Sequence, residues 1–225
     1  MTIIKIDAEP NPISIALEAT ALIVIDMQKD FLYPGGYGEA LGNDPRLLAS
    51  AIAPAQRVLQ AARSKKMMVV HTREGHLPDL SDCPDTKLLR WPEGNRIGDP
   101  GPMGRILIRG EMGHGIVDEM KPAPGETVID KPGKNAFYKT DLDNILRRQG
   151  IKNLLITGVT TDVCCGTTIS AANDHGYNAI TLADCMAAYD PRRHTAAIDI
   201  IKAQGGIFGW VTDSGKVLTA LMCPG

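Results

Sequence analysis

The sequence predicts an α/β fold, a three-layer sandwich with helices on both faces of a mainly parallel sheet. Six short apolar runs recur along the chain, and the segments between them have the apolar spacing of amphipathic helices. Most of the runs are continuously apolar and do not alternate, which is typical of strands buried on both faces. Strand and helix patterns alternate along the chain, and this order is typical of the three-layer class.

The expected elements can be given by residue range. The strands are 21–25, 67–70, 127–129, 154–156, 179–182 and 207–211. The helices are 47–64, 141–149, 162–175 and 191–204. The last three helices begin at Asp or Pro, which are common helix-start residues. The stretch 75–124 interrupts the alternation with many Gly and Pro residues, and we expect a lid, an oligomer contact or a plain surface excursion there.

Size and composition favour one domain that spans residues 1–225. The chain is 44% hydrophobic, which is enough for one substantial α/β core. Its formal net charge is -2, and it has neither a Lys/Arg run nor a basic stripe with aromatic residues. A nucleic-acid partner is therefore not expected, and a small neutral or weakly charged molecule fits better.

Neither a targeting segment nor a membrane span is indicated. Residues 1–20 alternate polar and apolar side chains and lack the basic flank and apolar block of a signal peptide. No run approaches the length of a membrane helix. The cysteines show no CxxC pair and no metal-ligand spacing; they are Cys83, Cys164, Cys165, Cys185 and Cys223. We therefore expect a reduced, cytoplasmic protein without disulfides or zinc.

Three chemically useful side chains follow expected strands. Asp26 comes directly after 21–25, Lys131 follows 127–130, and Cys164 lies beyond 154–159 at the start of the next helix. In open parallel sheets the ligand crevice lies beyond the carboxyl ends of the strands. A thiol at a helix N-terminus faces unpaired N–H groups and the positive end of the dipole, which favours thiolate. An Asp can serve as base for this thiol, and the lysine ammonium can lower both pKa values.

Each of these residues also has a purely structural interpretation. Cys164 alone fits a small buried hydrophobic residue, and Cys165 beside it shows that thiols occur here without an obvious role. Asp26 alone fits a turn or cap, and Lys131 alone fits a surface lysine. Three such residues at the ends of different strands are harder to explain in this way, and together they predict nucleophilic catalysis.

Three motifs resemble those of the isochorismatase-like cysteine hydrolases, and they occur in the order of that family. The run 21–31 ends in Asp-x-Gln-x-Asp-Phe and resembles the family's opening strand. Segment 131–137, Lys-Pro-Gly-Lys-Asn-Ala-Phe, with Thr-Asp-Leu at 140–142, resembles its lysine segment. Segment 158–164, Gly-Val-Thr-Thr-Asp-Val-Cys, resembles its nucleophile turn. The similarity covers about 20–210 and the motifs are specific in combination.

The resemblance implies a catalytic triad of Asp26, Lys131 and Cys164. Lys131 is preferred to Lys134 because it begins the motif and directly follows the strand. Cys165 stands where relatives usually carry Val, and the spacing from the Gly-x-x-Thr-Asp-Val turn assigns the nucleophile to Cys164.

The resemblance further implies an oxyanion hole and a site without metal. The family places a cis peptide in the nucleophile turn, here at Val159–Thr160, which would aim the N–H of Thr160 beside that of Cys164. Nicotinamidases of this family hold a metal through an Asp-x-His arrangement and further histidines. No Asp-x-His occurs here, and His71 and His76 fit structural or pocket-edge roles. No metal and no cofactor are expected.

Several segments resemble biuret hydrolase and its ureido-amide relatives, namely 71–76, 98–102, 104–107, 109–111, 129–134 and 204–206. In that branch Lys134 and Gln204 correspond to residues that bind substrate carbonyl and amide groups, with Phe31 as a pocket wall. Planar ureido amides need paired donors and acceptors more than apolar volume. The resemblance implies cleavage of a carbon–nitrogen bond in biuret or triuret through a Cys164 thioester, with release of ammonia.

Alternatives stay open at this stage. Tyr138 and His114 are larger or more polar than expected of biuret enzymes, so the longer triuret fits as well. A ureidoacrylate-type or nicotinamidase-like amidase is a further alternative. A true isochorismatase would not require Cys164, and a non-catalytic binding protein on the same fold would not require the whole triad. The family also implies a homo-oligomer, with a tetramer as the expected state.

Overall fold

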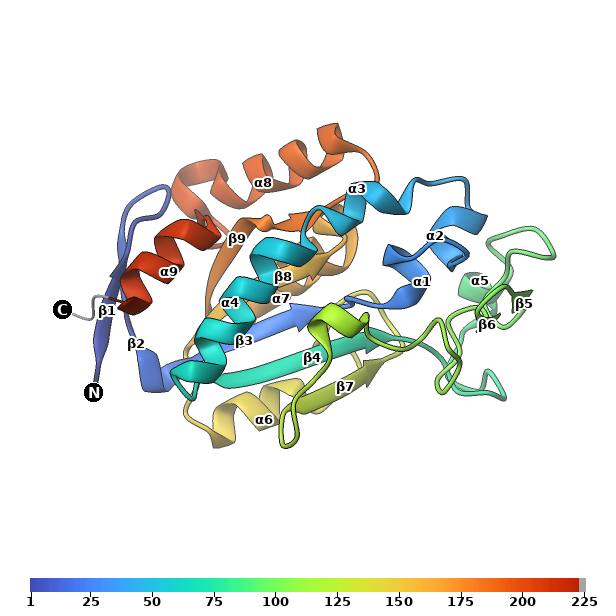
Figure 1. Cartoon of the computed structure of the whole chain (residues 1–225), viewed down its shortest axis with the longest axis horizontal. Coiled ribbons are helices and arrows are strands. Elements are labelled where there is room, and N and C mark those ends of the chain that lie inside the picture. The colour runs from blue at the N-terminus through green and yellow to red at the C-terminus, as the bar shows by residue number, and fades with distance from the viewer. Residues whose placement is uncertain (223–225) are drawn as a thin grey trace.

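Six parallel strands form the central sheet of the computed structural model, which describes residues 1–222. They lie in the order β10-β9-β8-β3-β4-β7, and every neighbouring pair is parallel (Figure 1). Their bounds are β3 Thr20–Ile25, β4 Met68–Glu74, β7 Thr127–Lys131, β8 Asn153–Val159, β9 Asn178–Ala187 and β10 Trp210–Thr212. Every residue of β3 and β8 is buried, as their continuous apolar runs predict.

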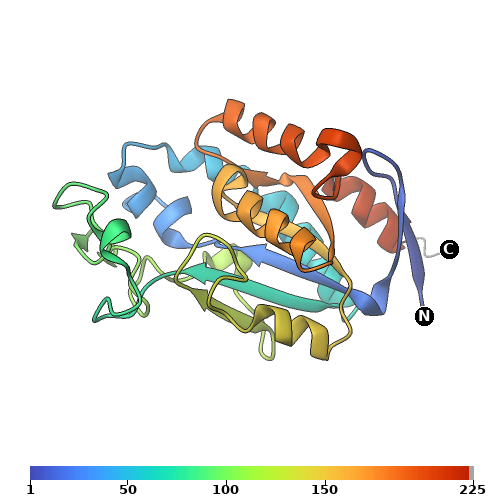
Figure 2. The same cartoon turned by 180° about the vertical axis from the view of Figure 1, so that it is seen from behind.

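Helices cover both faces of this sheet, so the expected three-layer α/β class is confirmed. The helix pair α4 and α9 covers the face seen in Figure 1, and α6 and α7 cover the face seen in Figure 2. The helix bounds are α4 Ile52–Ser64, α6 Leu142–Arg148, α7 Gly166–Asp174, α8 Pro191–Gly206 and α9 Ser214–Met222. Alternate residues of β3 belong to the two cores, because successive strand side chains point to opposite faces.

Several elements differ from the sequence prediction. The expected helix 47–64 is divided into α3 (Pro45–Ala49) and α4, and the expected helix 162–175 begins with a π-helical turn at Thr161–Cys165. The alternating N-terminal residues form an antiparallel hairpin of β1 (Ile3–Ile6) and β2 (Ile13–Ala16), joined to β3 by a short 3-10 turn at Leu17–Ala19. Helix α9 follows β10 and was not expected.

The irregular stretch that leaves β4 extends from the carboxyl end of the sheet. It contains α5 (Asp85–Leu88), the two-residue strands β5 (Pro100–Gly101) and β6 (Gly104–Arg105), and a 3-10 turn at Asp118–Met120 (Figure 1). The short helices α1 (Lys29–Leu32) and α2 (Tyr37–Ala40) lie beside it. A small apolar cluster holds this region together, with Tyr37, Ile97, Ile106, Leu107 and Ile108 among its buried members. The irregular stretch, called the excursion below, is therefore ordered structure packed at the carboxyl end of the sheet.

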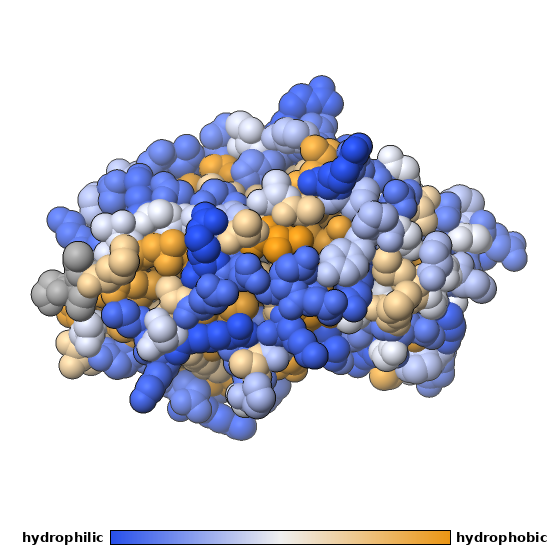
Figure 3. Space-filling view, viewed as in Figure 1, coloured by the Kyte–Doolittle hydropathy of each residue, from blue (hydrophilic) through white to orange (hydrophobic). Residues whose placement is uncertain are grey.

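The surface and the cysteines add two observations. On the face shown in Figure 3, hydrophilic residues predominate and apolar residues gather in limited areas between them. No helix among residues 1–222 combines the length and apolar character needed to cross a membrane. Cys83, Cys164, Cys165 and Cys185 are free thiols, whereas Cys223 lies outside the described residues.

Candidate active site

Four ionisable side chains meet at the carboxyl ends of neighbouring strands. Asp26 follows β3, Glu74 ends β4, Lys131 ends β7, and Cys164 lies in the turn after β8. Each is at most 5% exposed. The chain passes from β3 to β4 and β7 on one side and then returns to β8 on the other, so the site lies at the switch point of the sheet. Ligands bind at such points in open α/β sheets.

Asp26 and Lys131 form a fully buried ion pair. The Lys131 Nζ lies 2.7 Å from Oδ2 of Asp26 and also donates to the carbonyl oxygens of Gly133 (2.9 Å) and Lys134 (2.8 Å). Although burial disfavours its charge, the surrounding anionic groups, Asp26 first, hold the pKa of Lys131 above its ordinary value. The three acceptors match the three protons of the ammonium and fix it in place.

The backbone at Asp26 aims its carboxylate at the lysine. Its φ of 48° lies in the left-handed region, which is uncommon for a residue with a side chain. The hydroxyl of Thr72 on β4 donates to the Asp26 Oδ1 at 2.7 Å, while the Asp26 N–H points back to Thr72. The strained turn is thus held by the neighbouring strand, as expected of a functional position.

Cys164 rests as a protonated thiol. Its Sγ donates to Oε2 of Glu74 at 3.5 Å. Burial raises the pKa of the Cys164 thiol well above its ordinary value, and the Lys131 ammonium opposes this effect. Burial is the larger influence on the resting thiol, so the thiolate that the helix terminus and Lys131 favour has to be formed by removal of the Cys164 proton.

Glu74 is a functional candidate that the sequence analysis did not single out. Both of its carboxylate oxygens accept from Lys134 Nζ (2.7 and 2.9 Å), and Lys87 Nζ lies 3.3 Å from Oε1. Although burial favours protonation, the ammonium groups of Lys134, Lys131 and Lys87 lower the pKa of Glu74 to about 2. Its place at the end of a strand beside Asp26 was the signal that could have identified it.

The glutamine of the Asp-x-Gln motif positions Glu74. The side chain of Gln28 donates to the Glu74 carbonyl at 2.9 Å and accepts from the Glu74 N–H at 2.7 Å. It also donates to the His114 carbonyl at 3.2 Å. The buried Gln28 side chain therefore connects the segment after β3 to the end of β4 and to the end of the excursion by hydrogen bonds.

The nucleophile turn has the backbone that its motif predicts. The Val159–Thr160 peptide is cis, as expected. Gly158 has a φ of 121°, and a Cβ there would collide with the Ile25 carbonyl oxygen, so only glycine allows β8 to approach β3 this closely. Outside the regular helix and strand bonds of residues 1–222, no acceptor is found for the N–H of Thr160, which leaves this group available for the expected oxyanion hole. Cys164 lies inside the π-helical turn that follows.

The site opens into a cavity of about 350 Å³. Cys164, Glu74, Thr160, Lys134 and Phe31 all line it, the last two as expected. The other lining residues are Tyr37, Gly38, Leu41, Asn43, Trp91, Val159, Asp162, Val163, Tyr189 and Arg193. A pocket of this size holds a small molecule, and its polar groups converge on the thiol.

Comparison with known proteins agrees with this geometry. Residues 20–215 match the model of the isochorismatase domain. The chain belongs to the isochorismatase family. It is 33% identical to the ureidoacrylate amidohydrolase RutB of Yersinia enterocolitica over 213 residues, which covers 92% of this chain and 91% of that protein. The predicted family resemblance is thereby confirmed.

Two solved structures extend the family comparison. A cysteine hydrolase from Pseudomonas syringae pv. phaseolicola superposes with a TM-score of 0.80 at 29% identity, covering 92% of this chain and 94% of that one. N-carbamoylsarcosine amidase from Thermoplasma acidophilum gives 0.67 at 27% identity, covering 87% and 96%. The relatives named by their substrate are a ureidoacrylate amidohydrolase and an N-carbamoylsarcosine amidase, and these names fit the ureidoacrylate-type alternative better than the biuret or triuret assignment.

Cys165 and Gln204 lie apart from the cavity of this isochorismatase-family chain. Cys165 is buried in the apolar core beneath the nucleophile turn. Gln204 is exposed at the end of α8, where its φ of 52° leaves the helical region. Arg193 near the other end of α8 lines the cavity, and eleven helical residues span about 16 Å. The structure therefore does not bring Gln204 together with the triad residues of the same chain.

Tyr138 and His114 also lie outside the cavity wall. Tyr138 is 48% exposed, and its ring lies against Gly133. His114 is buried with its Nε2 3.5 Å from Asp130 Oδ1, and burial lowers its pKa to about 4. Neither side chain lines the cavity, so the pocket wall gives no support to the argument for triuret that rests on their size and polarity.

Asp26, Glu74 and Cys164 also lie close enough to be considered as metal ligands. Their ligand atoms are within 4.8 Å of one another, and they form the one such group of three found among residues 1–222. However, Lys131 lies against the Asp26 carboxylate, and Lys134 contacts both oxygens of Glu74. Because these ammonium groups occupy the positions of a cation, the donor set does not fit a resident metal.

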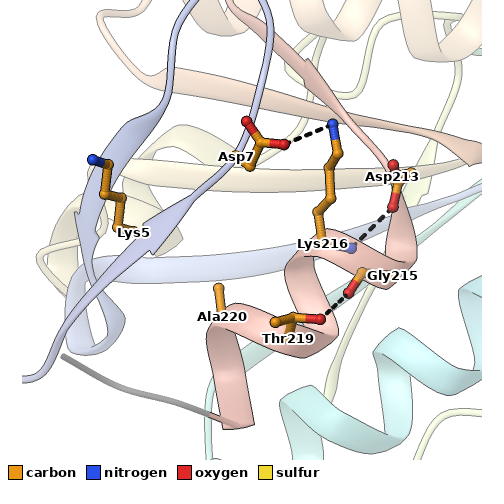
Figure 4. Close-up of a pocket in the computed structure, with 7 residues that line it drawn as sticks. All are labelled: Lys5, Asp7, Asp213, Gly215, Lys216, Thr219 and Ala220. Atoms are coloured by element: carbon orange, nitrogen blue, oxygen red, sulfur yellow. Dashed lines mark hydrogen bonds and ion pairs between the residues drawn. The ribbon is translucent and has the colours of Figure 1, made fainter.

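A second hollow lies beside the N-terminal hairpin and lacks such chemistry. It is lined by Lys5, Asp7, Asp213, Gly215, Lys216, Thr219 and Ala220 (Figure 4). Its charged groups bind one another: Lys216 Nζ lies 3.0 Å from Asp7 Oδ2, and the Lys216 N–H donates to Asp213 Oδ1 at 2.9 Å. None of the thiols or histidines among residues 1–222 lines it, and we assign it no function.

Proposed function

We propose that the protein is an amidohydrolase that cleaves a carbon–nitrogen bond of a small ureido compound carrying a carboxylate, of the ureidoacrylate type. The observation that carries this proposal is the Cys164 thiol in a cavity between two carboxylate–ammonium pairs, Asp26–Lys131 and Glu74–Lys134. A serine or cysteine nucleophile with a nearby base is the arrangement that acyl transfer requires. The named relatives act on ureidoacrylate and N-carbamoylsarcosine, both of which contain a ureido group.

The reaction begins when Asp26 accepts the Cys164 proton and the sulfur attacks the ureido carbonyl carbon. A carbon–sulfur bond forms, and the N–H groups of Thr160 and Cys164 hold the oxyanion of the tetrahedral intermediate. Asp26 returns the proton to the departing nitrogen, so the amine leaves neutral and the acyl group stays on sulfur. Water activated by Asp26 then hydrolyses this thioester, and the Cys164 thiol is regenerated.

Arg193 supports a substrate with a carboxylate. It lines the cavity, and among residues 1–222 no carboxylate lies within ion-pair distance of its guanidinium. The neighbouring Arg192, in contrast, is paired with Asp190 at 2.8 Å. An arginine that is free at the rim of a pocket can bind a carboxylate with two parallel hydrogen bonds. The proposed orientation places the ureido group at Cys164 and the acid at Arg193.

Biuret or triuret is the second candidate substrate, and the polar pair beside the thiol favours it. Lys134 can donate to a carbonyl oxygen, and Glu74 can accept from an amide N–H. Neutral ureido amides would use these two groups without needing Arg193. The two candidates therefore differ in their dependence on one residue.

The test is a substrate panel of ureidoacrylate, N-carbamoyl amino acids, biuret, triuret and nicotinamide. We expect the highest kcat/KM for a carboxylated ureido compound and a loss on the order of 10-fold or more in Arg193→Gln, because a charge-assisted hydrogen bond contributes roughly 1.5–3 kcal/mol. Arg192→Gln is the matched control and should change little. Higher kcat/KM for biuret or triuret, unaffected by Arg193→Gln, would transfer the assignment to the neutral substrates.

A further inference from the structure

The excursion after β4 places a third lysine, in addition to Lys131 and Lys134, beside the catalytic centre. Lys87 lies on the single-turn helix α5 and points its ammonium at three acceptors. The Lys87 Nζ lies 2.7 Å from the Pro132 carbonyl oxygen, 2.9 Å from His76 Nε2 and 3.3 Å from Glu74 Oε1. Its three protons are thereby matched by three acceptors on three different segments.

A buried histidine orients this lysine. Because His76 Nε2 faces the ammonium, Nε2 must accept and the ring proton must lie on Nδ1. Nδ1 faces Asp82 Oδ1 at 3.0 Å, and the second oxygen of Asp82 accepts from Arg109 at 3.1 Å. Burial, with the Lys87 charge, lowers the pKa of His76, which agrees with a neutral ring. The chain of contacts therefore runs from Arg109 through Asp82, His76 and Lys87 to Glu74.

The same excursion is fixed to the end of β4 by backbone bonds. The His76 N–H donates to the Leu107 carbonyl at 2.8 Å, and the Arg109 N–H donates to the His76 carbonyl at 2.9 Å. Arg109 also donates from Nε to the Gly75 carbonyl at 3.1 Å. The histidine and its neighbours are thus held in place independently of the lysine.

Lys87 changes the charge balance around the nucleophile. The charged groups there form two sets: the ammoniums of Lys87 and Lys134 contact the Glu74 carboxylate, and the Lys131 ammonium contacts the Asp26 carboxylate. Three positive and two negative charges leave one positive charge in surplus while the thiol is neutral. Loss of the Cys164 proton to solvent, which alkylation of the free protein measures, brings the sum to zero, whereas transfer of that proton to Asp26 leaves one positive charge in surplus beside the thiolate. In both cases the Lys87 charge favours the anionic sulfur.

We propose that Lys87 is a positioning residue that fixes the Glu74 carboxylate and supplies the positive charge that balances the Cys164 thiolate, with His76 and Asp82 orienting it. The ionisable groups that face Lys87 are Glu74 of β4, Lys134 of the loop after β7, and His76 and Cys83 of the excursion. This role concerns the nucleophile itself and does not depend on which ureido compound is the substrate.

The test is the pH dependence of Cys164 alkylation by iodoacetamide in the full chain, followed by mass spectrometry that distinguishes Cys164 from the other cysteines. In Lys87→Met we expect the apparent pKa of Cys164 to rise by about one unit, which lowers the alkylation rate near neutral pH about tenfold. Lys65→Met, which removes an exposed lysine, is the matched control and should leave the rate unchanged. The assay needs no substrate, so its result stands apart from that of the substrate panel.

Two further variants keep the test decisive if Lys87→Met folds poorly. Asp82→Asn retains the lysine and weakens its orientation through His76, so we expect a smaller shift in the same direction. The double variant Asp82→Asn/Lys87→Met should shift the Cys164 pKa no further than Lys87→Met alone, because both changes act through one ammonium. An unchanged alkylation profile in folded Lys87→Met, or in Asp82→Asn if the former does not fold, would overturn the proposal.

Discussion

Cys164 Sγ donates to Oε2 of Glu74, 3.5 Å away, although the sequence indicates Asp26 as the base of the nucleophile. The two carboxylates differ in their surroundings. Lys134 contacts both oxygens of Glu74 and Lys87 contacts one of them, which, despite burial, lowers the pKa of Glu74 to about 2. A carboxylate with so low a pKa is a weak proton acceptor, so Glu74 fits an electrostatic role. Asp26 keeps the role of base in the proposed mechanism.

Replacement of the two adjacent cysteines should have opposite results. Cys164→Ser should lower kcat on the order of 10³-fold or more, because the nucleophile is lost. Cys165→Ser should retain turnover, since Cys165 is buried in the core and does not line the cavity. Steady-state kinetics on the preferred substrate decides between them. Activity that survives in Cys164→Ser and disappears in Cys165→Ser would reverse the assignment.

Asp26→Asn should remove both proton transfers of the cycle. The amide keeps the size of Asp26 but cannot accept the thiol proton, so we expect kcat to fall on the order of 10²-fold or more. Glu74→Gln removes an equal charge at the same site and is the matched comparison. If Glu74→Gln lowers kcat as much as Asp26→Asn and abolishes the acidic limb of the pH–rate profile, then Glu74 is the base.

The sequence predicts the sheet, its flanking helices and the triad positions because these depend on local patterns. Continuous apolar runs identify β3 and β8, and polar residues directly after them identify Asp26 and Cys164. Glu74 is missed for a physical reason: the apolar run ends at residue 70, whereas β4 continues through the polar residues 71–74. These four residues pair with β7, and all except Arg73 are buried, a tertiary effect that hydropathy does not contain.

Lys87 and Gln204 show a second limit of prediction from the sequence. The approach of Lys87 to Glu74 depends on the path of the irregular segment 75–124, and irregular paths are set by long-range contacts such as the bridge between His76 and Ile108. Gln204 was assigned a substrate contact from resemblance, yet α8 carries it toward the N-terminal hairpin, where Lys202 pairs with Glu9 at 2.9 Å. Motif similarity fixes residue types but not the distances between them.

Lys134→Ala and Gln204→Ala should therefore have different effects on kcat/KM. Lys134 lines the cavity and contacts both oxygens of Glu74, so we expect Lys134→Ala to lower kcat/KM at least 10-fold, as loss of a charge-assisted hydrogen bond predicts. Gln204→Ala should leave kcat/KM within about 2-fold, since an exposed position far from the thiol costs little. A large loss in Gln204→Ala would mean that this residue reaches the cavity of another copy of the chain.

Glu126 provides a test of acid stability away from the catalytic centre. Its carboxylate accepts from Arg63 (2.7 and 2.9 Å), His71 (2.9 Å) and the Ala123 N–H (2.8 Å), and despite burial these bonds lower the pKa of Glu126 to about 2. A carboxyl group with a depressed folded-state pKa stabilises the fold above its unfolded pKa near 4.5 and loses this contribution as the pH falls toward 2.

Glu126→Gln should consequently lower the free energy of unfolding by about 1–3 kcal/mol at pH 7. The difference from wild type should shrink between pH 4.5 and 2, because the wild-type carboxyl group is then protonated as well. Denaturant unfolding at several pH values measures this difference in the free energy of unfolding. A difference that stays constant down to pH 2 would show that packing, and not the charge, accounts for the effect.

Exhaustive chelation should leave turnover intact. Asp26, Glu74 and Cys164 offer two carboxylates and a sulfur within 4.8 Å, but Lys131 and Lys134 already occupy the cation positions beside the two carboxylates. A divalent ion could enter only by displacing these ammonium groups, and thiolate with carboxylate ligands is a set that Zn²⁺ accepts. We therefore expect added Zn²⁺ to inhibit by binding Cys164 and a chelator to reverse the inhibition, while chelator alone changes neither kcat nor KM. Activity that disappears on chelation and returns with a divalent metal would contradict this course and make the three residues a metal site.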